Sequence, residues 1–144
     1  MKTNVLVILL LVCCFRSGLA QEKPKADTSG TANVPEDYQL SDKQLADWKS
    51  IQNAWYATEY DRVKYDMKIT TGCKTCNAFY MDVIIKINGA GKMESYKVLN
   101  GKACGRAMNK AEELRMMKMF FKFEFAGSLR NTTFKTRLGT ILKC

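Results

Sequence analysis

Hydrophobic residues repeat with two different periods along the chain, and the change of period near residue 60 separates a helical part from a β part. Residues 41–44 have the Ser-x-x-Gln spacing of a capping box, which is typical of a helix N-terminus. The pattern therefore predicts one amphipathic helix that begins at this box and ends within residues 56–60. Five positions behind the box recur at helical spacing: Leu45, Trp48, Ile51, Gln52 and Trp55.

Beyond this helix, apolar and polar residues alternate as they do in strands that are buried on one face. The alternation predicts one strand over residues 63–69 and another over 79–87, joined by the loop 71–78. Residues 88–91, Asn-Gly-Ala-Gly, have the composition of a turn and precede a weaker alternating strand over 93–99. We therefore expect the middle of the chain to form antiparallel hairpins.

Two further alternating sets lie nearer the C-terminus. One predicts a strand over residues 117–125, and the apolar residues of 134–142 mark a fifth strand. Residues 102–115 permit a short helix without requiring one. The whole pattern predicts an α+β fold, in which one long amphipathic helix packs against an antiparallel sheet of four or five strands.

The N-terminal region has the layout of an export signal. Residues 1–20 contain an early basic residue, an apolar run over 5–15 and small residues before Ala20, where we expect cleavage. The apolar run is far shorter than the roughly 20 residues that span a bilayer, so no transmembrane segment is expected. Residues 21–36 are polar and are expected to form a flexible tail before a single domain over 37–144. The chain is therefore predicted to be secreted and extracellular.

The chain is basic, with 23 lysine and arginine residues against 14 acidic ones and a formal net charge of +9 at pH 7. A net positive charge attracts acidic partners and surfaces. It provides information about association and not about the fold. The basic residues are scattered, and neither an RNA-binding aromatic motif nor a helix-turn-helix pattern accompanies them. A solvated basic surface is therefore favoured over a nucleic-acid-binding site.

Histidine is absent from the chain, which removes the commonest general base and the commonest zinc ligand. Paired carboxylates offer no replacement, because Glu112 and Glu113 would face different ways on a helix. Asp66 and Asp82 fall on solvent-facing positions of the predicted strands. No Gly-rich phosphate loop is present. Enzymatic activity is therefore not expected, and no catalytic residue, cofactor or metal ion is predicted.

Four cysteines follow the predicted signal: Cys73, Cys76, Cys104 and Cys144. Cys73-x-x-Cys76 lies in a loop between predicted strands rather than before a helix, which disfavours a thioredoxin-like dithiol. The four thiols would also suit a zinc site, but export to an oxidising space favours disulfides. Three connectivities exist for four cysteines. The preferred one joins Cys73 to Cys76 and Cys104 to Cys144, and the longer of these two loops contributes about 3 to 4 kcal/mol.

Residues 69–83 read Ile-Thr-Thr-Gly-Cys-Lys-Thr-Cys-Asn-Ala-Phe-Tyr-Met-Asp-Val, and residues 121–144 place a loop between two strand-like segments that end on Cys144. In pattern and order, residues 40–144 resemble the cystatin superfamily. In that family a long helix is wrapped by an antiparallel sheet, and a hairpin ending in Gly leads into an Asn-Tyr-aliphatic-Asp-Val strand. A final hairpin ends on a disulfide-bonded cysteine. The resemblance implies a cystatin-like fold.

Cystatins inhibit papain-like cysteine proteases, so the resemblance implies an inhibitor with such a protease as its partner. The family fills the catalytic cleft with a wedge made of an N-terminal Gly, a Gln-x-Val-x-Gly hairpin and a Pro-Trp hairpin. These motifs are degenerate here, because only the glycines are retained at the matching positions. Carried over by position, the protease-binding residues would be Gly30, Thr70, Thr71, Gly72, Gly127, Ser128 and Leu129.

Two alternatives stand beside inhibition. One is a small lipocalin-like ligand carrier, suggested by Trp48 and Trp55 ahead of alternating strands, although a barrel needs more strands than the chain offers. The other is a non-inhibitory cystatin-fold protein that binds an acidic protein partner or surface, and its binding would weaken with salt. The exposed basic residues proposed for that role are Lys64, Lys68, Lys86, Lys118, Lys122, Lys135 and Arg137.

Asn131-Thr132-Thr133 is an N-glycosylation sequon in the predicted last hairpin loop. A glycan on Asn131 would crowd the edge that a cystatin presents to its target, and would favour a non-inhibitory role. The protein is expected to be a monomer, with a domain-swapped dimer as the alternative for a fold made of one helix and hairpins.

Overall fold

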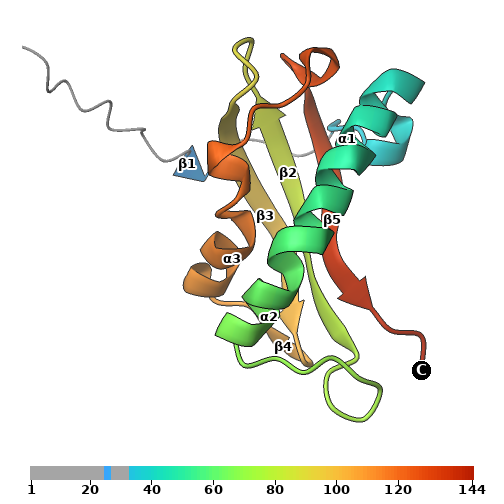
Figure 1. Cartoon of the computed structure of the whole chain (residues 1–144), viewed down its shortest axis with the longest axis vertical. Coiled ribbons are helices and arrows are strands. Elements are labelled where there is room, and N and C mark those ends of the chain that lie inside the picture. The colour runs from blue at the N-terminus through green and yellow to red at the C-terminus, as the bar shows by residue number, and fades with distance from the viewer. Residues whose placement is uncertain (1–24, 27–32) are drawn as a thin grey trace, which may run out of the picture.

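The computed structural model describes residues 25–26 and 33–144 (Figure 1). The predicted signal peptide, residues 1–20, and Gly30 lie outside the described residues, as does most of the predicted tail. In the described part, helices cover one face of an antiparallel sheet, so the predicted α+β class is confirmed. None of the helices described is both long enough and apolar enough to cross a membrane.

The longest helical segment has three parts: α1 (Asp42–Trp55), a π-helical turn (Tyr56–Tyr60) and α2 (Asp61–Asp66). Its start is the predicted capping box. The Gln44 backbone amide donates to the Ser41 hydroxyl, and the Ser41 backbone amide donates to the Gln44 side chain at 3.1 Å. The two bonds satisfy amides that a helix N-terminus would otherwise leave unpaired, which confirms the predicted start.

Three long strands make the sheet: β2 (Ala78–Ile87), β3 (Met93–Ala103) and β5 (Thr133–Ile141). β2 is central and pairs antiparallel with β3 on one side and β5 on the other. The short strand β4 (Arg106–Ala107) pairs antiparallel with β3, and β1 (Lys25–Ala26) pairs with β3 in parallel. The long helix thus packs against four antiparallel strands, to which β1 is a parallel addition.

The segment between β3 and β5 contains α3 (Lys110–Met117) and two 3₁₀ turns, Phe120–Lys122 and Gly127–Leu129. A third 3₁₀ turn, Asp37–Gln39, precedes α1. Figure 1 shows α3 on the same face of the sheet as α1 and α2, so two helical segments lie side by side over the strands. This arrangement creates the cleft described below.

The core between helices and sheet is organised around aromatic side chains. Trp48 and Trp55 are fully buried, and the ring of Phe120 lies 6.0 and 6.2 Å from theirs between centroids. Trp48 also meets Phe134 of β5 edge to face at 5.0 Å. Its indole N–H donates to the Thr136 hydroxyl at 3.1 Å, so this buried donor is satisfied. The core therefore fastens α1, the turn after α3 and β5 together.

The outer edge of β5 is covered by side chains of the helix. Gln52 Nε2 donates to the Arg137 carbonyl at 2.9 Å. The Tyr56 hydroxyl donates to the Gly139 carbonyl at 2.7 Å and accepts from the Gly139 amide at 3.1 Å. These bonds occupy backbone groups that an open edge strand would expose to pairing with another chain.

The predicted strand over residues 63–69 is wrong, because its first part belongs to α2. Val63 is 3% exposed, but Tyr65, which a strand would bury on the same face, is 84% exposed. The helix therefore also passes its predicted end within residues 56–60. Val63 lies at helical spacing from Tyr60 and Tyr56 as well as in an alternating run, and packing under the continued helix decides between the two periods.

The predicted strand over residues 117–125 is also wrong. Met116 and Met117 are adjacent and both fully buried at the end of α3, whereas adjacent residues of a strand face opposite sides. The strand over 79–87, the turn over 88–91 and the strand near the C-terminus are confirmed. The weaker strand starting at Met93 is confirmed too, but it continues to Ala103.

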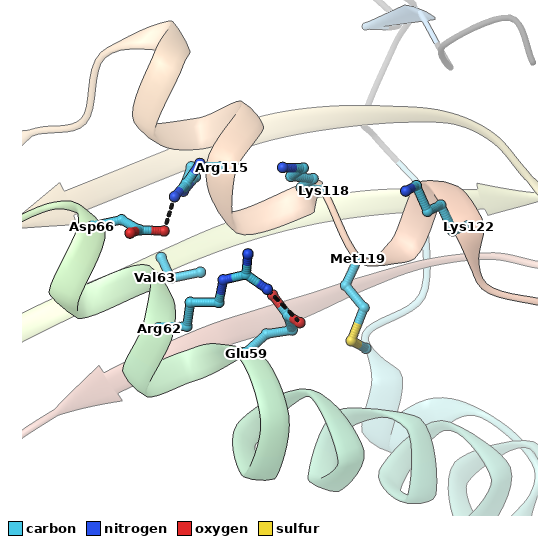
Figure 2. A pocket seen from close by; sticks show the side chains of 8 residues that line it. All are labelled: Glu59, Arg62, Val63, Asp66, Arg115, Lys118, Met119 and Lys122. Atoms are coloured by element: carbon cyan, nitrogen blue, oxygen red, sulfur yellow. Dashed lines mark ion pairs between the residues drawn. The ribbon is translucent and has the colours of Figure 1, made fainter.

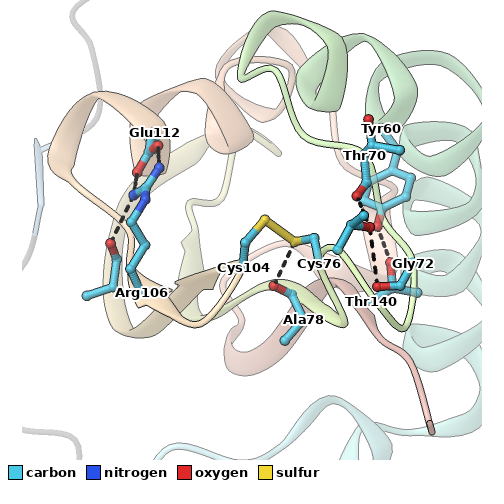
Figure 3. The surroundings of a disulfide bond; sticks show 11 residues. Tyr60, Thr70, Gly72, Cys76, Ala78, Cys104, Arg106, Glu112 and Thr140 are labelled. Atoms are coloured by element: carbon cyan, nitrogen blue, oxygen red, sulfur yellow. Dashed lines mark hydrogen bonds and ion pairs between the residues drawn. A yellow bond between two sulfur atoms is a disulfide. The ribbon is translucent and has the colours of Figure 1, made fainter.

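Two disulfides, Cys73–Cys144 and Cys76–Cys104, close the end of the sheet where β2 begins. All four predicted cysteines are bonded, but the preferred pairing of Cys73 with Cys76 and of Cys104 with Cys144 is wrong. Hydrogen bonds between the Gly72 and Cys76 backbones close a turn around these two cysteines, and their sulfurs bond to different partners. Cys76 is 2% exposed and reaches Cys104 at the end of β3 (Figure 3), while the exposed Cys73 reaches the C-terminus.

Candidate functional site

The predicted wedge residues are not brought together by the fold. Residues 70–72 precede the start of β2, where the disulfides lie. The turn Gly127–Leu129 lies near the other end of β2, because the Asn131 amide donates to the Asn88 carbonyl just beyond that strand. Ten residues of β2 separate the two loops, which corresponds to about 30 Å at roughly 3.3 Å per residue.

The side chains of the second predicted loop are occupied inside the molecule. Leu129 is fully buried, so it offers no apolar tip to a protease cleft. The Ser128 hydroxyl donates to Asp47 of α1, which lowers the pKa of that carboxyl group. The segments before Gly72 and before Gly127 are not strands, so neither of the hairpins that carried the cystatin resemblance is formed.

Most of the basic residues named from the sequence have an acidic neighbour. On the uncovered sheet face, Lys86 pairs with Glu94 at 2.8 Å and Arg137 with Asp82 at 2.6 Å. Lys135 lies on the same face, two residues before Arg137, and pairs with Glu36 at 3.3 Å. Elsewhere Lys64 pairs with Asp61 at 2.8 Å, and Lys68 lies in the turn after α2. The basic residues that were named on this sheet face are therefore each paired with a carboxylate.

Lys118 and Lys122 line a cleft of about 260 Å³ between the long helix and the segment that contains α3 (Figure 2). The α2 side contributes Arg62 and Val63, and Val63 is buried beneath the opening. Met119 approaches from the other side, where its sulfur accepts a bond from the Thr58 hydroxyl. The complete lining is Glu59, Arg62, Val63, Asp66, Arg115, Lys118, Met119 and Lys122.

Charge is unevenly matched in this cleft. Arg115 pairs with Asp66 across it, and Arg62 approaches Glu59 at 3.9 Å (Figure 2). Among the residues that the structure describes, Lys118 forms no ion pair, and neither does Lys122, although both line the same opening. Four cationic side chains thus face two carboxylates, and the cleft carries an excess of two positive charges.

The start of α3 positions its part of the cleft. The Asn109 side chain accepts from the Glu112 amide at 3.0 Å, and Glu112 accepts in return from the Asn109 amide at 2.9 Å. Arg106 donates to both carboxylate oxygens of Glu112, at 2.8 and 2.5 Å. This fork lowers the pKa of Glu112 and raises the pKa of Arg106. With Phe120 anchored in the core beyond it, α3 is fixed at both ends.

The cleft was not predicted from the sequence, because the periodicity of both of its walls indicated strands. Arg62 and Arg115 were not predicted as site residues, Met119 was assigned to the predicted strand over 117–125, and Asp66 was placed on a solvent-facing strand. One overlooked signal could have found the second wall. Asn109-Lys110-Ala111-Glu112 has capping-box spacing, and a helix begun there puts Arg115, Lys118 and Lys122 on one face.

The sequon asparagine lies in the loop before β5, at the opposite end of β2 from the disulfides. Asn131 is exposed, has a φ of 57° and lies beside Gly89 of the β2–β3 turn. Its modification stays a prediction. A glycan there would cover the β2–β3 turn.

By fold the molecule is an α+β protein with two disulfides, and by site it offers a small cationic cleft rather than a group of reactive side chains. No family model matches the chain, and neither a curated protein nor a solved structure matches it. Membership of the cystatin superfamily therefore stays a prediction from pattern.

Proposed function

We propose that this is a non-enzymatic, extracellular binding protein whose cleft binds acidic side chains of a protein partner. The observation that carries the proposal is the unbalanced charge: Lys118 and Lys122 have no carboxylate partner in the described residues, while Arg62 and Arg115 have one each. The lack of histidine supports a non-enzymatic role. Two disulfides support an oxidising, extracellular location.

The dimensions of the cleft favour protein side chains over a small organic ligand. Pockets for small molecules typically enclose about 300 to 1,000 Å³ and are lined mainly by apolar groups. This cleft has about 260 Å³ and charged walls. A carboxylate entering it would meet two lysines and the exposed part of the Arg62 guanidinium, whose planar fork suits carboxylate oxygens.

Protease inhibition is less well supported by the geometry. An inhibitory wedge needs its loops at one edge, but residues 70–72 and Gly127–Leu129 lie at opposite ends of β2. Leu129, the apolar tip that the wedge requires, is buried. Binding in the basic cleft does not require distant loops to meet, because the residues that line the cleft are already adjacent.

The test compares two variants of equal charge. Replacing Lys118→Gln and Lys122→Gln together should weaken binding of a fluorescein-labelled hexaglutamate peptide about fivefold, since exposed ion pairs contribute up to about 1 kcal/mol each. The matched control replaces Lys49→Gln and Lys102→Gln, two exposed lysines outside the cleft. Fluorescence anisotropy at several salt concentrations measures both affinities, and binding should weaken as salt rises.

Equal loss of affinity in the two variants would contradict the proposal, because it would show that the peptide responds to net charge alone. No binding by the unmodified mature chain at low salt would contradict it as well. Tight inhibition of papain that survives in the Lys118→Gln, Lys122→Gln variant would move the function to another surface.

A further inference from the structure

α3 separates the basic cleft from a second hollow on its other side. This apolar hollow has a volume of about 310 Å³ and is formed almost entirely by α3 and the turn after it. Leu114 is one of its lining residues and is 39% exposed. The complete lining is Ala111, Leu114, Arg115, Lys118 and Phe121.

The two hollows share Arg115 and Lys118. Ala111, Leu114, Arg115 and Lys118 follow the spacing of one helical stripe, so the cationic groups form the border between an apolar and a basic depression. An α-helix with its side chains is about 10 to 12 Å across. One short segment of a partner can therefore reach both hollows at once.

The chain's own N-terminal tail does not suit the apolar hollow. Residues 21–33 contain no valine, leucine, isoleucine, methionine or aromatic residue, so the tail brings no large apolar side chain after the predicted cleavage. An occupant of the hollow needs a large apolar side chain to exclude water from Leu114, because polar side chains gain little free energy from covering apolar surface.

A second copy of the chain does not suit it either. Contact of Leu114 with Leu114 across a two-fold axis would bring Arg115 and Lys118 of both copies together. Like charges placed against each other at an interface disfavour association. The cationic border instead complements an acidic partner.

We infer that α3 is a docking helix for a partner segment in which a carboxylate side chain and a large apolar side chain lie about three residues apart in extended conformation. The carboxylate enters the basic cleft, and the apolar side chain covers Leu114. This inference rests on the proposed function of the cleft and adds the second determinant that distinguishes the partner from other acidic proteins.

The experiment measures anisotropy of labelled peptides with the full mature, oxidised chain. The first peptide has three glutamates separated by Gly-Ser from Phe-Leu. The second has Ser-Ser in place of Phe-Leu, and the third has serines in place of the glutamates. The first should bind about tenfold more tightly than the second, the gain expected from burying one large apolar side chain. The third should bind most weakly.

Two single variants, at leucines with similar exposed fractions, test whether the gain in affinity depends on Leu114. Leu114→Ser should remove the preference for the first peptide and leave binding of the second unchanged. Leu99→Ser, at a residue that is 41% exposed on β3, should preserve the preference. Circular dichroism of both variants checks that they fold alike.

The outcomes test docking on α3 separately from acidic binding in the cleft. Equal binding of the first two peptides would overturn the docking inference and leave the acidic cleft standing. Binding of neither would overturn the proposed function. A preference that survives Leu114→Ser would place the apolar site elsewhere. A change of oligomeric state in that variant, seen by sedimentation, would show that the hollow joins two copies of this chain.

Discussion

At Gly139 the last strand lies very close to the backbone of its neighbour. Its φ is 96°, which side chains other than glycine rarely adopt, and a Cβ there would clash with the carbonyl oxygen of Phe79 in β2. Both backbone groups of Gly139 also bond to the Tyr56 hydroxyl. A single residue thus holds β5 between β2 and the helix.

Gly139→Ala is expected to lower the free energy of unfolding by about 3 kcal/mol, because it adds a clash to an unfavourable dihedral. The matched control is Gly127→Ala, where no atom lies within 4 Å of the new Cβ, and its cost should stay below about 1 kcal/mol. Chemical denaturation of both variants measures the difference. Similar midpoints would contradict the tight approach of β5 to β2.

Among the elements, α3 has a charged fork at its start. Glu112 both completes the capping box with Asn109 and receives the Arg106 fork, and its pKa is lowered as a result. A carboxyl group whose pKa is lower in the folded state stabilises the fold above its unfolded pKa. That contribution is lost as the pH falls through the lower folded pKa.

The fold should therefore lose stability as the pH drops below about 4.3, the ordinary pKa of a glutamate. Glu112→Gln keeps a side chain that can cap but removes the titrating group, so the stability of this variant should depend less on pH in that range. Thermal melts across acid pH measure both proteins. Parallel pH profiles would show that Glu112 does not contribute to acid sensitivity.

Local signals predicted the elements that packing did not override. The Ser41 box gave the helix start, and the alternation over 79–87 gave the central strand with its core face. The two walls of the cleft were missed because their apolar residues satisfy more than one period. Residues 63–69 alternate, yet Val63 also lies at helical spacing from Tyr60 and Tyr56, and only the packing of the assembled helix against the sheet settles the choice.

The candidate site was less predictable than the fold. Lys118 and Lys122 were named among seven scattered basic residues, but nothing local separated them from lysines that carboxylates neutralise, such as Lys86 and Lys135. That distinction depends on contacts between elements far apart in sequence. The disulfide pairing failed for the same reason, since Cys76 is close to Cys73 in sequence but faces Cys104 across the end of the sheet.

At the scale of the molecule, the disulfides fasten three distant points of the chain at one end. Cys73–Cys144 closes a separation of 71 residues, and Cys76–Cys104 closes one of 28. The C-terminus and the end of β3 are thereby both tied to the loop that precedes β2. In the chain-entropy description, each bond stabilises the fold by restricting the unfolded state.

Replacing either pair by alanine should lower the free energy of unfolding by about 3 to 4 kcal/mol, and the Cys73–Cys144 pair should cost about 1 kcal/mol more because its loop is longer. Guanidinium denaturation of the two double variants gives the comparison. Peptide mapping under non-reducing conditions checks the pairing directly. A fragment that joins Cys73 to Cys76 would contradict the described connectivity.

The π-helical turn Tyr56–Tyr60 contains one residue more than an α-helical turn, and this extra residue decides which side chain after it faces the core. In a regular α-helix the residue seven positions after Trp55 shares its face, which would turn Arg62 toward the sheet. The wider turn holds one residue more, so Val63 is buried and Arg62 stays at the opening. The segment therefore carries a spare residue. A relative one residue shorter in this turn would keep the same core and the same charged face on a regular α-helix.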